Sequence, residues 1–305
     1  MNQEVAGKAA KRATPMPSGC SCVASGNAAQ ERRVYFCEQY AGNERARHAR
    51  IESALRDALA ERELALAWQP VVDRVSDRTV CAEALLRWTH RELGIVPPAL
   101  FVPIAERAGL IERVGDWVID EACAQAARWR RHAESDLCVA VNVSPLQLNR
   151  RFVRKVSRVL ELSGLPPSAL ELEITESRPM FDTASVVSTI AAIANFGVKL
   201  VIDDFGTGYS SLSYLRRLPV HGLKIDRSFV MGLPHEGRSA LIVEGLTKIA
   251  HAMELTVTAE GVETNEQAAF LRECGVDRMQ GFLFSRALDP GDFIGRYGTL
   301  ANRRE

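Results

Sequence analysis

The chain has 305 residues, 47% hydrophobic and 25% charged, which is the composition of a soluble globular protein. It carries 38 basic and 38 acidic side chains, which argues against a bulk polyanion partner such as duplex DNA. We find no window with the roughly 18 uncharged apolar residues of a membrane span, and no apolar signal core at the N-terminus. The seven cysteines are an odd number, and several lie in apolar patterns, so we expect reduced thiols and a cytoplasmic location.

Residues 1–45 are expected to form a flexible N-terminal tail or connector. Met1 to Gln30 are rich in small and polar residues and show no amphipathic period. Three cysteines fall in this part of the chain: Cys20, Cys22 and Cys37. Their spacing is not a strong zinc signature, so we favour ordinary thiols over a metal or redox cluster. The folded domain is expected to occupy residues 46–305.

The first predicted elements of that domain are a helix and a pair of strands. Asn43–Glu63 carries an apolar stripe at helical spacing. Leu64–Val72 and Thr79–Trp88 have the pattern of strands, and only Asp73–Arg78 join them. A parallel pair needs a crossover of about a dozen residues or more, so we predict an antiparallel hairpin.

After the hairpin, predicted helices and strands alternate. The helices are Leu100–Ala108, Asp116–Arg131, Pro145–Leu162, Thr183–Phe196, Ser210–Arg217, Arg238–Met253, Asn265–Cys274 and Pro290–Tyr297. The strands are Leu137–Val143, Leu170–Thr175, Leu200–Asp204, Gly222–Asp226, Leu255–Glu260 and Asp277–Phe282. This order predicts an α/β fold, a (β/α)8 TIM-like barrel whose first strand is antiparallel to the rest. The alternative is an open doubly wound sheet, which would require a glycine-rich phosphate fingerprint that we do not find.

The most informative stretch runs from Val201 to Ser211. A short apolar strand there ends in two adjacent carboxylates, Asp203 and Asp204. Adjacent strand residues point to opposite faces, so both acids can serve one cluster only if the backbone turns. Gly206 and Gly208 would allow such a turn. Two acids at the end of a buried strand indicate a site for a hard metal ion.

Other predicted strands also contain or end in polar residues. They are Glu83, Asn142, Glu173, Glu176, Lys224, Glu260, Glu263 and Gln280. Each alone has an ordinary explanation as a solvated cap, a turn residue or an ion-pair partner. In a barrel, however, the C-terminal ends of the parallel strands converge on one rim. An oxygen-rich cluster without histidine or cysteine suits Mg²⁺ or Mn²⁺, and two ions bridged by Asp203 would suit phosphodiester hydrolysis.

These residues lie in motifs that resemble those of the EAL-domain cyclic-di-GMP phosphodiesterases. The likeness covers roughly Ile51 to Leu288 and includes Glu83-Ala84-Leu85, the motif that names the family. The other matching motifs are Trp68-Gln69-Pro70, Asn142-Val143-Ser144, Glu173-Ile174-Thr175-Glu176-Ser177, Asp203 to Ser211, Leu223 to Val230, Ala259 to Glu263 and Gln280-Gly281-Phe282. Many motifs in the right order make this likeness specific, whereas the three-letter motif alone would be weak.

The resemblance implies a two-metal hydrolase that opens cyclic-di-GMP to the linear dinucleotide pGpG. The first ion, Mg²⁺ or Mn²⁺, would be held by Glu83, Asn142, Glu173 and Asp203. The second would be held by Asp203, Asp204 and Glu260. Glu83, Lys224 and Glu260 are the implied catalytic residues, with Lys224 helping to deprotonate a water. The implied substrate contacts are Gln69, Arg87, Asp204 and Gln280, with Glu263 as a further candidate.

The resemblance also implies how the site is regulated. Glu176 would steady the loop after the strand that ends at Asp204, and Phe205 to Ser211 would be a mobile lid that senses a homodimer interface. Two alternatives stay open at this point. The chain could be a catalytically silent EAL domain that binds cyclic-di-GMP or a protein partner, or a barrel enzyme of unrelated chemistry such as a metal-dependent lyase. Lys224 in isolation could be a Schiff-base lysine in the latter case.

Overall fold

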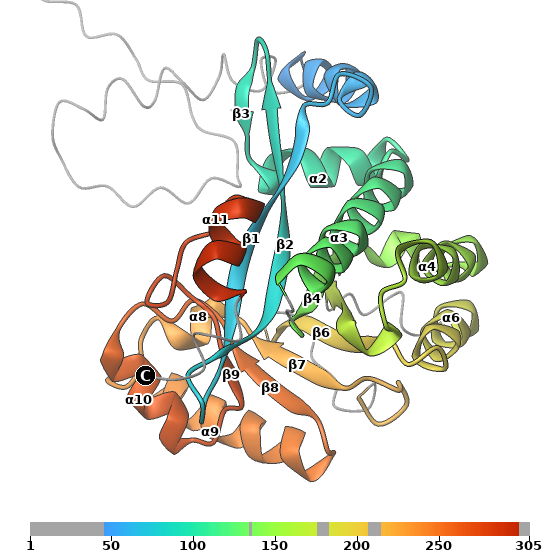
Figure 1. Ribbon diagram of the computed structural model, residues 1–305. Coiled ribbons are helices and arrows are strands. Elements are labelled where there is room, and N and C mark those ends of the chain that lie inside the picture. Colours follow the sequence, from blue (N-terminus) through green and yellow to red (C-terminus); the bar gives the residue numbers. More distant parts are fainter. Residues whose placement is uncertain (1–45, 134–135, 176–182, 207–214, 299–305) are drawn as a thin grey trace, which may run out of the picture. The chain divides into compact units, whose positions relative to one another are not determined.

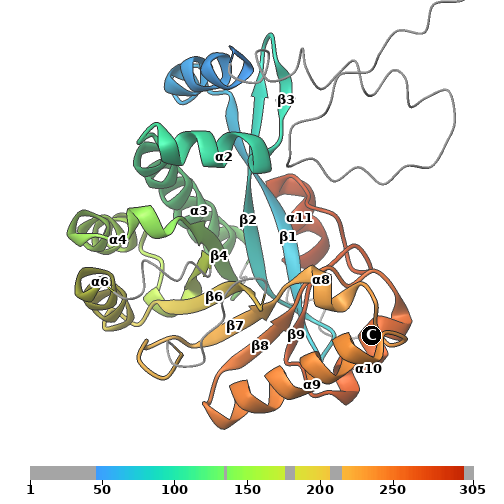
Figure 2. The same ribbon diagram turned by 180° about the vertical axis from the view of Figure 1, so that it is seen from behind.

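The computed structural model describes residues 46–133, 136–175, 183–206 and 215–298. In these ranges the strands form one sheet in the order β1-β9-β8-β7-β6-β5-β4-β2-β3, and an additional pairing between β1 and β2 closes it. Eight of the strands make the barrel, while the short β3 pairs only with β2 beyond it. Helices surround the strands (Figures 1 and 2). The predicted barrel is therefore confirmed.

All eight predicted strands are present, but the last is shorter than predicted, and the short β3 was not predicted. The strands are β1 (Leu64–Asp73), β2 (Thr79–His90), β3 (Gly94–Val96), β4 (Cys138–Val143), β5 (Leu170–Thr175), β6 (Lys199–Phe205), β7 (Gly222–Ile225), β8 (Thr256–Ala259) and β9 (Arg278–Met279). β1 pairs antiparallel with both β2 and β9, whereas the successive pairs from β2–β4 to β8–β9 are parallel. The short β1–β2 connection therefore imposes the reversed first strand, as predicted.

The helices differ from prediction mainly at their ends. They are α2 (Pro98–Arg107), α3 (Ile111–Ala133), α4 (Arg150–Ser163), α6 (Ala184–Ala194), α8 (Arg227–Val230), α9 (Gly237–Ala252), α10 (Asn265–Glu273) and α11 (Pro290–Tyr297), with 3₁₀ turns η1 (Pro145–Gln147) and η2 (Pro167–Ala169). The first helix covers residues 46–57 and does not continue to Glu63. The helix predicted from Pro145 is interrupted, because Asn149 caps a new helix by accepting hydrogen bonds from the backbone N–H groups of Arg151 and Phe152.

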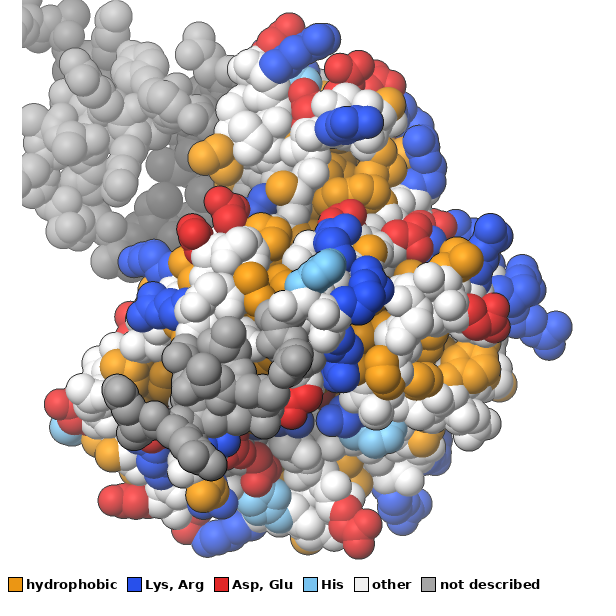
Figure 3. Space-filling model, viewed as in Figure 1, with side chains coloured by type: hydrophobic (Ala, Val, Ile, Leu, Met, Phe, Trp, Pro, Cys, Tyr) orange, Lys and Arg blue, Asp and Glu red, His pale blue; other side chains and the backbone are white. Residues whose placement is uncertain are grey.

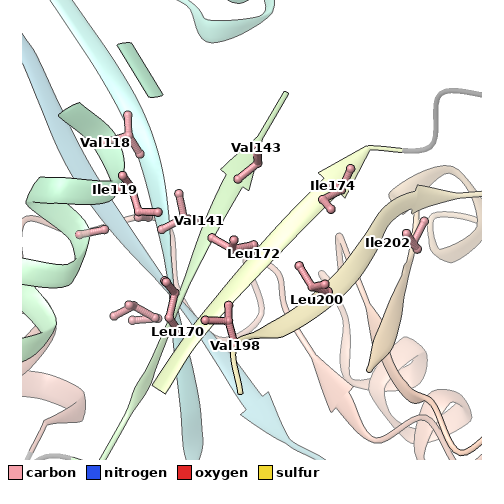
Figure 4. Close-up of a cluster of buried hydrophobic side chains, with 14 of the residues drawn as sticks. Val118, Ile119, Val141, Val143, Leu170, Leu172, Ile174, Val198, Leu200 and Ile202 are labelled. Atoms are coloured by element: carbon pink, nitrogen blue, oxygen red, sulfur yellow. The ribbon is translucent and has the colours of Figure 1, made fainter. Parts of the chain in front are cut away.

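The parallel strands are buried on both faces, and the two faces carry different residues. Leu170, Leu172 and Ile174 of β5 point outward into a layer of aliphatic side chains from β4, β6 and α3 (Figure 4). Glu171 and Glu173, which alternate with them, point the other way, into the barrel. The outer layer therefore supplies the hydrophobic core, and the lumen remains available for polar chemistry.

An aromatic stack covers the outer face of the antiparallel strand. The Trp68 ring of β1 meets the Trp129 ring of α3 edge-on, with centroids 4.7 Å apart. Trp129 in turn stacks on Phe293 of α11 at 5.2 Å. The last helix, α11, thus lies beside the first strand (Figure 1), and the aromatic packing holds it against β1 and α3.

The surface agrees with the balanced charge of the sequence. On the face seen in Figure 3, Lys and Arg side chains are interspersed with Asp and Glu, and apolar patches lie between them. In the described ranges, we find no helix that combines the length and the apolar character needed to cross a bilayer.

Candidate metal centre at the barrel mouth

The ammonium group of Lys224 lies within a ring of carboxylates inside the barrel. Its Nζ atom is 2.5 Å from Glu260 Oε1, 3.0 Å from Glu173 Oε2, 3.5 Å from Glu83 Oε2 and 3.7 Å from Asp203 Oδ1. Lys224 and Glu173 are 1% exposed, so this is a buried cluster and not a solvated rim. Five different strands or strand ends contribute these side chains.

Strand alternation explains why these residues meet. Glu173 follows Glu171 by two positions on β5 and therefore faces the lumen, and Lys224 occupies the lumen face of β7 in the same way. Their neighbours Ile174 and Ile225 face outward into the core. The same parity places Glu83 of β2 inside the barrel.

Asp203 and Asp204 reach one site because the backbone reverses at Asp204 itself. Asp204 has a φ of 53°, in the left-handed region, and the register between β6 and β7 is irregular between Ile202 and Phe205. The Asp204 N–H donates to Asp203 Oδ1 at 2.9 Å. Aspartate adopts this conformation more readily than most residues. The turn was predicted from Gly206 and Gly208. Gly206 does have a positive φ, of 100°, but the reversal begins two residues earlier.

Two amide side chains hold Glu83 in place from both sides. Asn142 Nδ2 donates to Glu83 Oε1 at 2.7 Å, and Gln280 Nε2 donates to Glu83 Oε2 at 2.5 Å. Gln280 Nε2 is also 3.2 Å from Gln69 Oε1, and Gln69 Nε2 donates to the Ser285 carbonyl at 3.0 Å. The predicted residues Gln69, Glu83, Asn142 and Gln280 are therefore joined in one hydrogen-bonded chain.

The pKa values of the buried carboxylates shift in different directions. Burial and the nearby charge of Glu83 hold the pKa of Glu173 well above its usual range, and burial raises the pKa of Glu260 to about 7. Burial acts on Glu83 too, but the charge of Lys224 and the two amide hydrogen bonds outweigh it and lower its pKa. For Lys224, burial lowers the pKa, but the surrounding carboxylates outweigh this and raise it well above normal.

The cluster has the donor set of a hard divalent cation. Asp203, Asp204 and Glu260 each present an oxygen within 4.8 Å of the others. In the described part of the chain, Gln280 Oε1 is fully buried without accepting a hydrogen bond, and Glu173 Oε2 is buried with the Lys224 ammonium at 3.0 Å. A buried oxygen without a hydrogen bond calls for a partner. Four carboxylates lie within 4 Å of one ammonium, and Asp204 adds a fifth acid beside them. Acids outnumber the single cation, so oxygen-preferring ions such as Mg²⁺ or Mn²⁺ fit the residues present.

A cavity of about 320 Å³ opens above this cluster. Its walls include the predicted residues Gln69, Glu83, Asn142, Asp203, Glu260, Glu263 and Gln280. They also include Leu85, Arg227 and Phe282, which were not predicted as site residues. The Arg227 stem crosses Gly261, where a Cβ atom would lie 2.4 Å from Arg227 Cγ. Arg227 comes directly after the strand that carries Lys224, and this position in the sequence could have identified it as a site residue.

Arg87 lies apart from this cavity. It lines a second, mainly apolar cavity of about 370 Å³ between β2, β4, α2 and α3, and its guanidinium donates to the Leu86 carbonyl at 3.0 Å. Asn142 and Leu85 line both cavities. The two spaces therefore adjoin.

Several predicted features lie outside the described residues. They are the tail of residues 1–45 with its three cysteines, Glu176, and Thr207 to Ser211 of the predicted lid. Phe205 and Gly206 are described, and a Cβ atom on Gly206 would lie 2.7 Å from the Phe229 ring. Phe229 therefore packs against the start of the predicted lid.

Sequence comparison relates this chain to a known group of proteins. A sequence profile described as "EAL domain" matches residues 52–287. A bifunctional diguanylate cyclase/cyclic di-GMP phosphodiesterase of Pseudomonas aeruginosa, MucR, is 43% identical over 235 residues, which are 77% of this chain and 34% of that protein. The cyclic di-GMP phosphodiesterase NbdA of the same organism is 41% identical over 239 residues, or 78% of this chain and 30% of that protein. The chain thus spans about a third of the length of these relatives.

Solved structures agree with the sequence comparison. The phosphodiesterase part of P. aeruginosa MucR in complex with c-di-GMP has a TM-score of 0.76 and 41% identity, covering 80% of this chain and 99% of that one. The EAL domain of Mycobacterium smegmatis DcpA has a TM-score of 0.66 and 35% identity, covering 79% and 97%. The barrel fold therefore has counterparts among solved structures.

Proposed function

The chain belongs to the EAL-domain family, and from that premise we propose that it is a metal-dependent phosphodiesterase that hydrolyses cyclic-di-GMP to linear pGpG. The observation that carries the proposal is the surplus of buried carboxylates around Lys224. Repulsion between these carboxylates destabilises the fold unless cations neutralise their charge. Clusters of this kind are common at the functional sites of enzymes. The substrate itself is inferred from the relatives named above.

We assign two cation positions to this cluster. Glu83, Asn142, Glu173 and Asp203 would hold the first. Asp203, Asp204 and Glu260 would hold the second, which makes Asp203 the bridge. Divalent cations bound there would supply positive charge to the scissile phosphate and favour ionisation of a nearby water.

Lys224 would accept a proton from the attacking water, and Gln280 would orient that water. While the surrounding carboxylates are uncompensated, they keep Nζ protonated. Once those charges are neutralised, burial is the main remaining influence on the pKa of Lys224 and favours the neutral amine. Nζ can then accept a proton from the attacking water. Gln280, already hydrogen-bonded to Glu83, would hold the water or the substrate in line.

The cavity above the cluster suits a guanine nucleotide. Arg227 and Glu263 lie 3.5 Å apart and offer donors and an acceptor side by side. Guanine presents O6 and N7 as acceptors, which a guanidinium can bind, and N1–H and N2–H as donors for a carboxylate. Phe282, 49% exposed in the same cavity, offers an aromatic face for stacking. Gln69 and Asp204 would contact the same half of the substrate, and Arg87 would contact the part that reaches the second cavity.

The test is hydrolysis of cyclic-di-GMP by the purified chain with Mg²⁺ or Mn²⁺, with the products separated by chromatography. We expect linear pGpG, and no product when the metal is chelated. Glu83→Ala should abolish turnover without unfolding the barrel, whereas Glu244→Ala, a matched change at an exposed ion pair, should leave turnover unchanged. Tight binding without any linear product would favour the silent receptor instead.

A further inference from the structure

Two cysteines that the proposed function does not use lie side by side in the barrel. Cys81 of β2 and Cys138 of β4 are Cα partners on adjacent parallel strands. Their Sγ atoms are 2.6 Å apart, although the residues are 57 positions apart in sequence. Cys81 is fully buried, and Cys138 is 7% exposed.

The two sulfur atoms face each other within a small buried cluster. Together with Val71 and Ala140 the two cysteines form a small apolar cluster, separate from the main core. Cys81 is also the Cα partner of Val71 on β1, so an apolar neighbour flanks the pair on that side. The ion pair between Arg278 and Glu171 lies close enough to influence the pKa of Cys81, which burial raises well above its usual range. Cys81 precedes Glu83 by two positions and faces the lumen with it, which places the pair below the carboxylate cluster.

The separation of the sulfurs indicates which chemistry the pair can perform. The two cysteines are free thiols whose Sγ atoms are in direct contact. A tetrahedral zinc ion with bonds of about 2.3 Å would hold two thiolates about 3.8 Å apart, so the pair does not fit metal chelation. Partners on neighbouring strands lie about 4.8 Å apart, inside the Cα range of roughly 4.4–6.8 Å for disulfides. We propose that Cys81 and Cys138 are a site of oxidation to an intrachain disulfide, with a hydroperoxide as the oxidant.

The reaction balances with one hydroperoxide. The sulfur of Cys138, the more exposed of the two and the first residue of β4, attacks hydrogen peroxide, becomes a sulfenic acid and releases water. The sulfur of Cys81 then attacks that sulfur, the S–S bond forms, and a second water leaves. Two thiols are oxidised by two electrons in total, and the peroxide is reduced to two waters.

The disulfide would link β2 and β4 covalently, and both strands carry proposed metal ligands. β2 carries Glu83, and β4 carries Asn142, which donates to it at 2.7 Å. The two cysteines are 57 positions apart, and a disulfide across a loop of this length lowers the conformational entropy of the unfolded chain. We therefore expect the oxidised protein to melt at least about 5 °C above the reduced protein.

The experiment compares reduced protein with protein treated with hydrogen peroxide, after thiol blocking, denaturation and tryptic digestion without reductant. The expected product is peptide 79–87 linked to peptide 132–150, lighter by two hydrogens than the sum of the two and separated by a thiol reductant. Cys81→Ala and Cys138→Ala should each lose the linked peptide and the melting shift. Cys123→Ala, at another buried cysteine, should keep both.

The proposal is overturned if both peptides from peroxide-treated wild type remain unlinked, or if either is linked to a different cysteine. A melting shift that persists in Cys81→Ala would also overturn it. None of these readouts requires hydrolysis of a nucleotide, so the test stands whatever the outcome of the phosphodiesterase assay.

Discussion

Glu260 should make the stability of the metal-free protein depend on pH in an unusual direction. Burial raises the pKa of Glu260 to about 7, against an ordinary value of 4.5. Between these two values the unfolded chain has lost the proton while the folded chain retains it. Folding then takes up a proton, so the free energy of unfolding falls as the pH rises. The stability is fully present below pH 4.5 and is lost as the pH passes 7.

The size of this effect follows from the two pKa values. Their difference of about 2.5 corresponds to about 3.4 kcal/mol, at 1.36 kcal/mol for each pKa unit. The Glu260 side chain is 20% exposed, so solvent screens it only in part. Glu173 should act in the same direction, since its pKa is also raised. Glu83 acts in the opposite direction, but only below about pH 4.5.

The measurement is urea unfolding with a metal chelator at several pH values from 5 to 8. Over this range Glu260 alone should cost wild type about 2.5 kcal/mol, and Glu260→Gln, which cannot ionise, should lose about 2.5 kcal/mol less than wild type. Saturating Mg²⁺ should restore stability at pH 8, because the cations bind the ionised form. An identical pH dependence in wild type and Glu260→Gln would refute the assignment of the proton to Glu260.

Three further predictions concern the turn and the cavity. Asp204→Val should cost about 1–2 kcal/mol because of the left-handed φ, whereas Asp204→Asn should keep stability, and both should weaken Mn²⁺ binding in calorimetry. Gly206→Ala should cost about 1–3 kcal/mol in chemical denaturation, since its Cβ would meet the Phe229 ring; unchanged stability would contradict that contact. Arg227→Ala should raise KM for cyclic-di-GMP several-fold with little change in kcat, while turnover of bis(p-nitrophenyl) phosphate, which lacks a base, should not change.

The barrel and most of the candidate site were predictable because they depend on local periodicity. Alternating outward aliphatic and inward polar residues, as in Leu172 and Glu173, are readable in a strand of any length. The short connection after Asp73 was enough to reverse the first strand. Since parallel strands end on one rim, the strand-end acids could be grouped before their distances were known.

Some local features escaped prediction because they arise from contacts between distant segments. The helix predicted through Glu63 ends at residue 57, and Glu63 instead accepts hydrogen bonds from Trp88 and Thr89 of β2. Arg227 joins the cavity only because α8 begins beside the loop that contains Gly261, and no spacing in the sequence links the two. Phe282, predicted inside a strand, instead follows β9 and faces the cavity.

The eight-stranded barrel, the reversed first strand and the grouping of polar residues on one rim were readable in the sequence, because each follows from residue patterns within single elements. The tertiary contacts were not readable there. They are the ion pairs of Lys224 with four of the acids, the turn at Asp204 itself, and the contact between Cys81 and Cys138. Direct contacts between side chains, and the pKa values that follow from them, depend on strand register and burial. Both are set when the barrel closes, since closure brings together residues far apart in the chain.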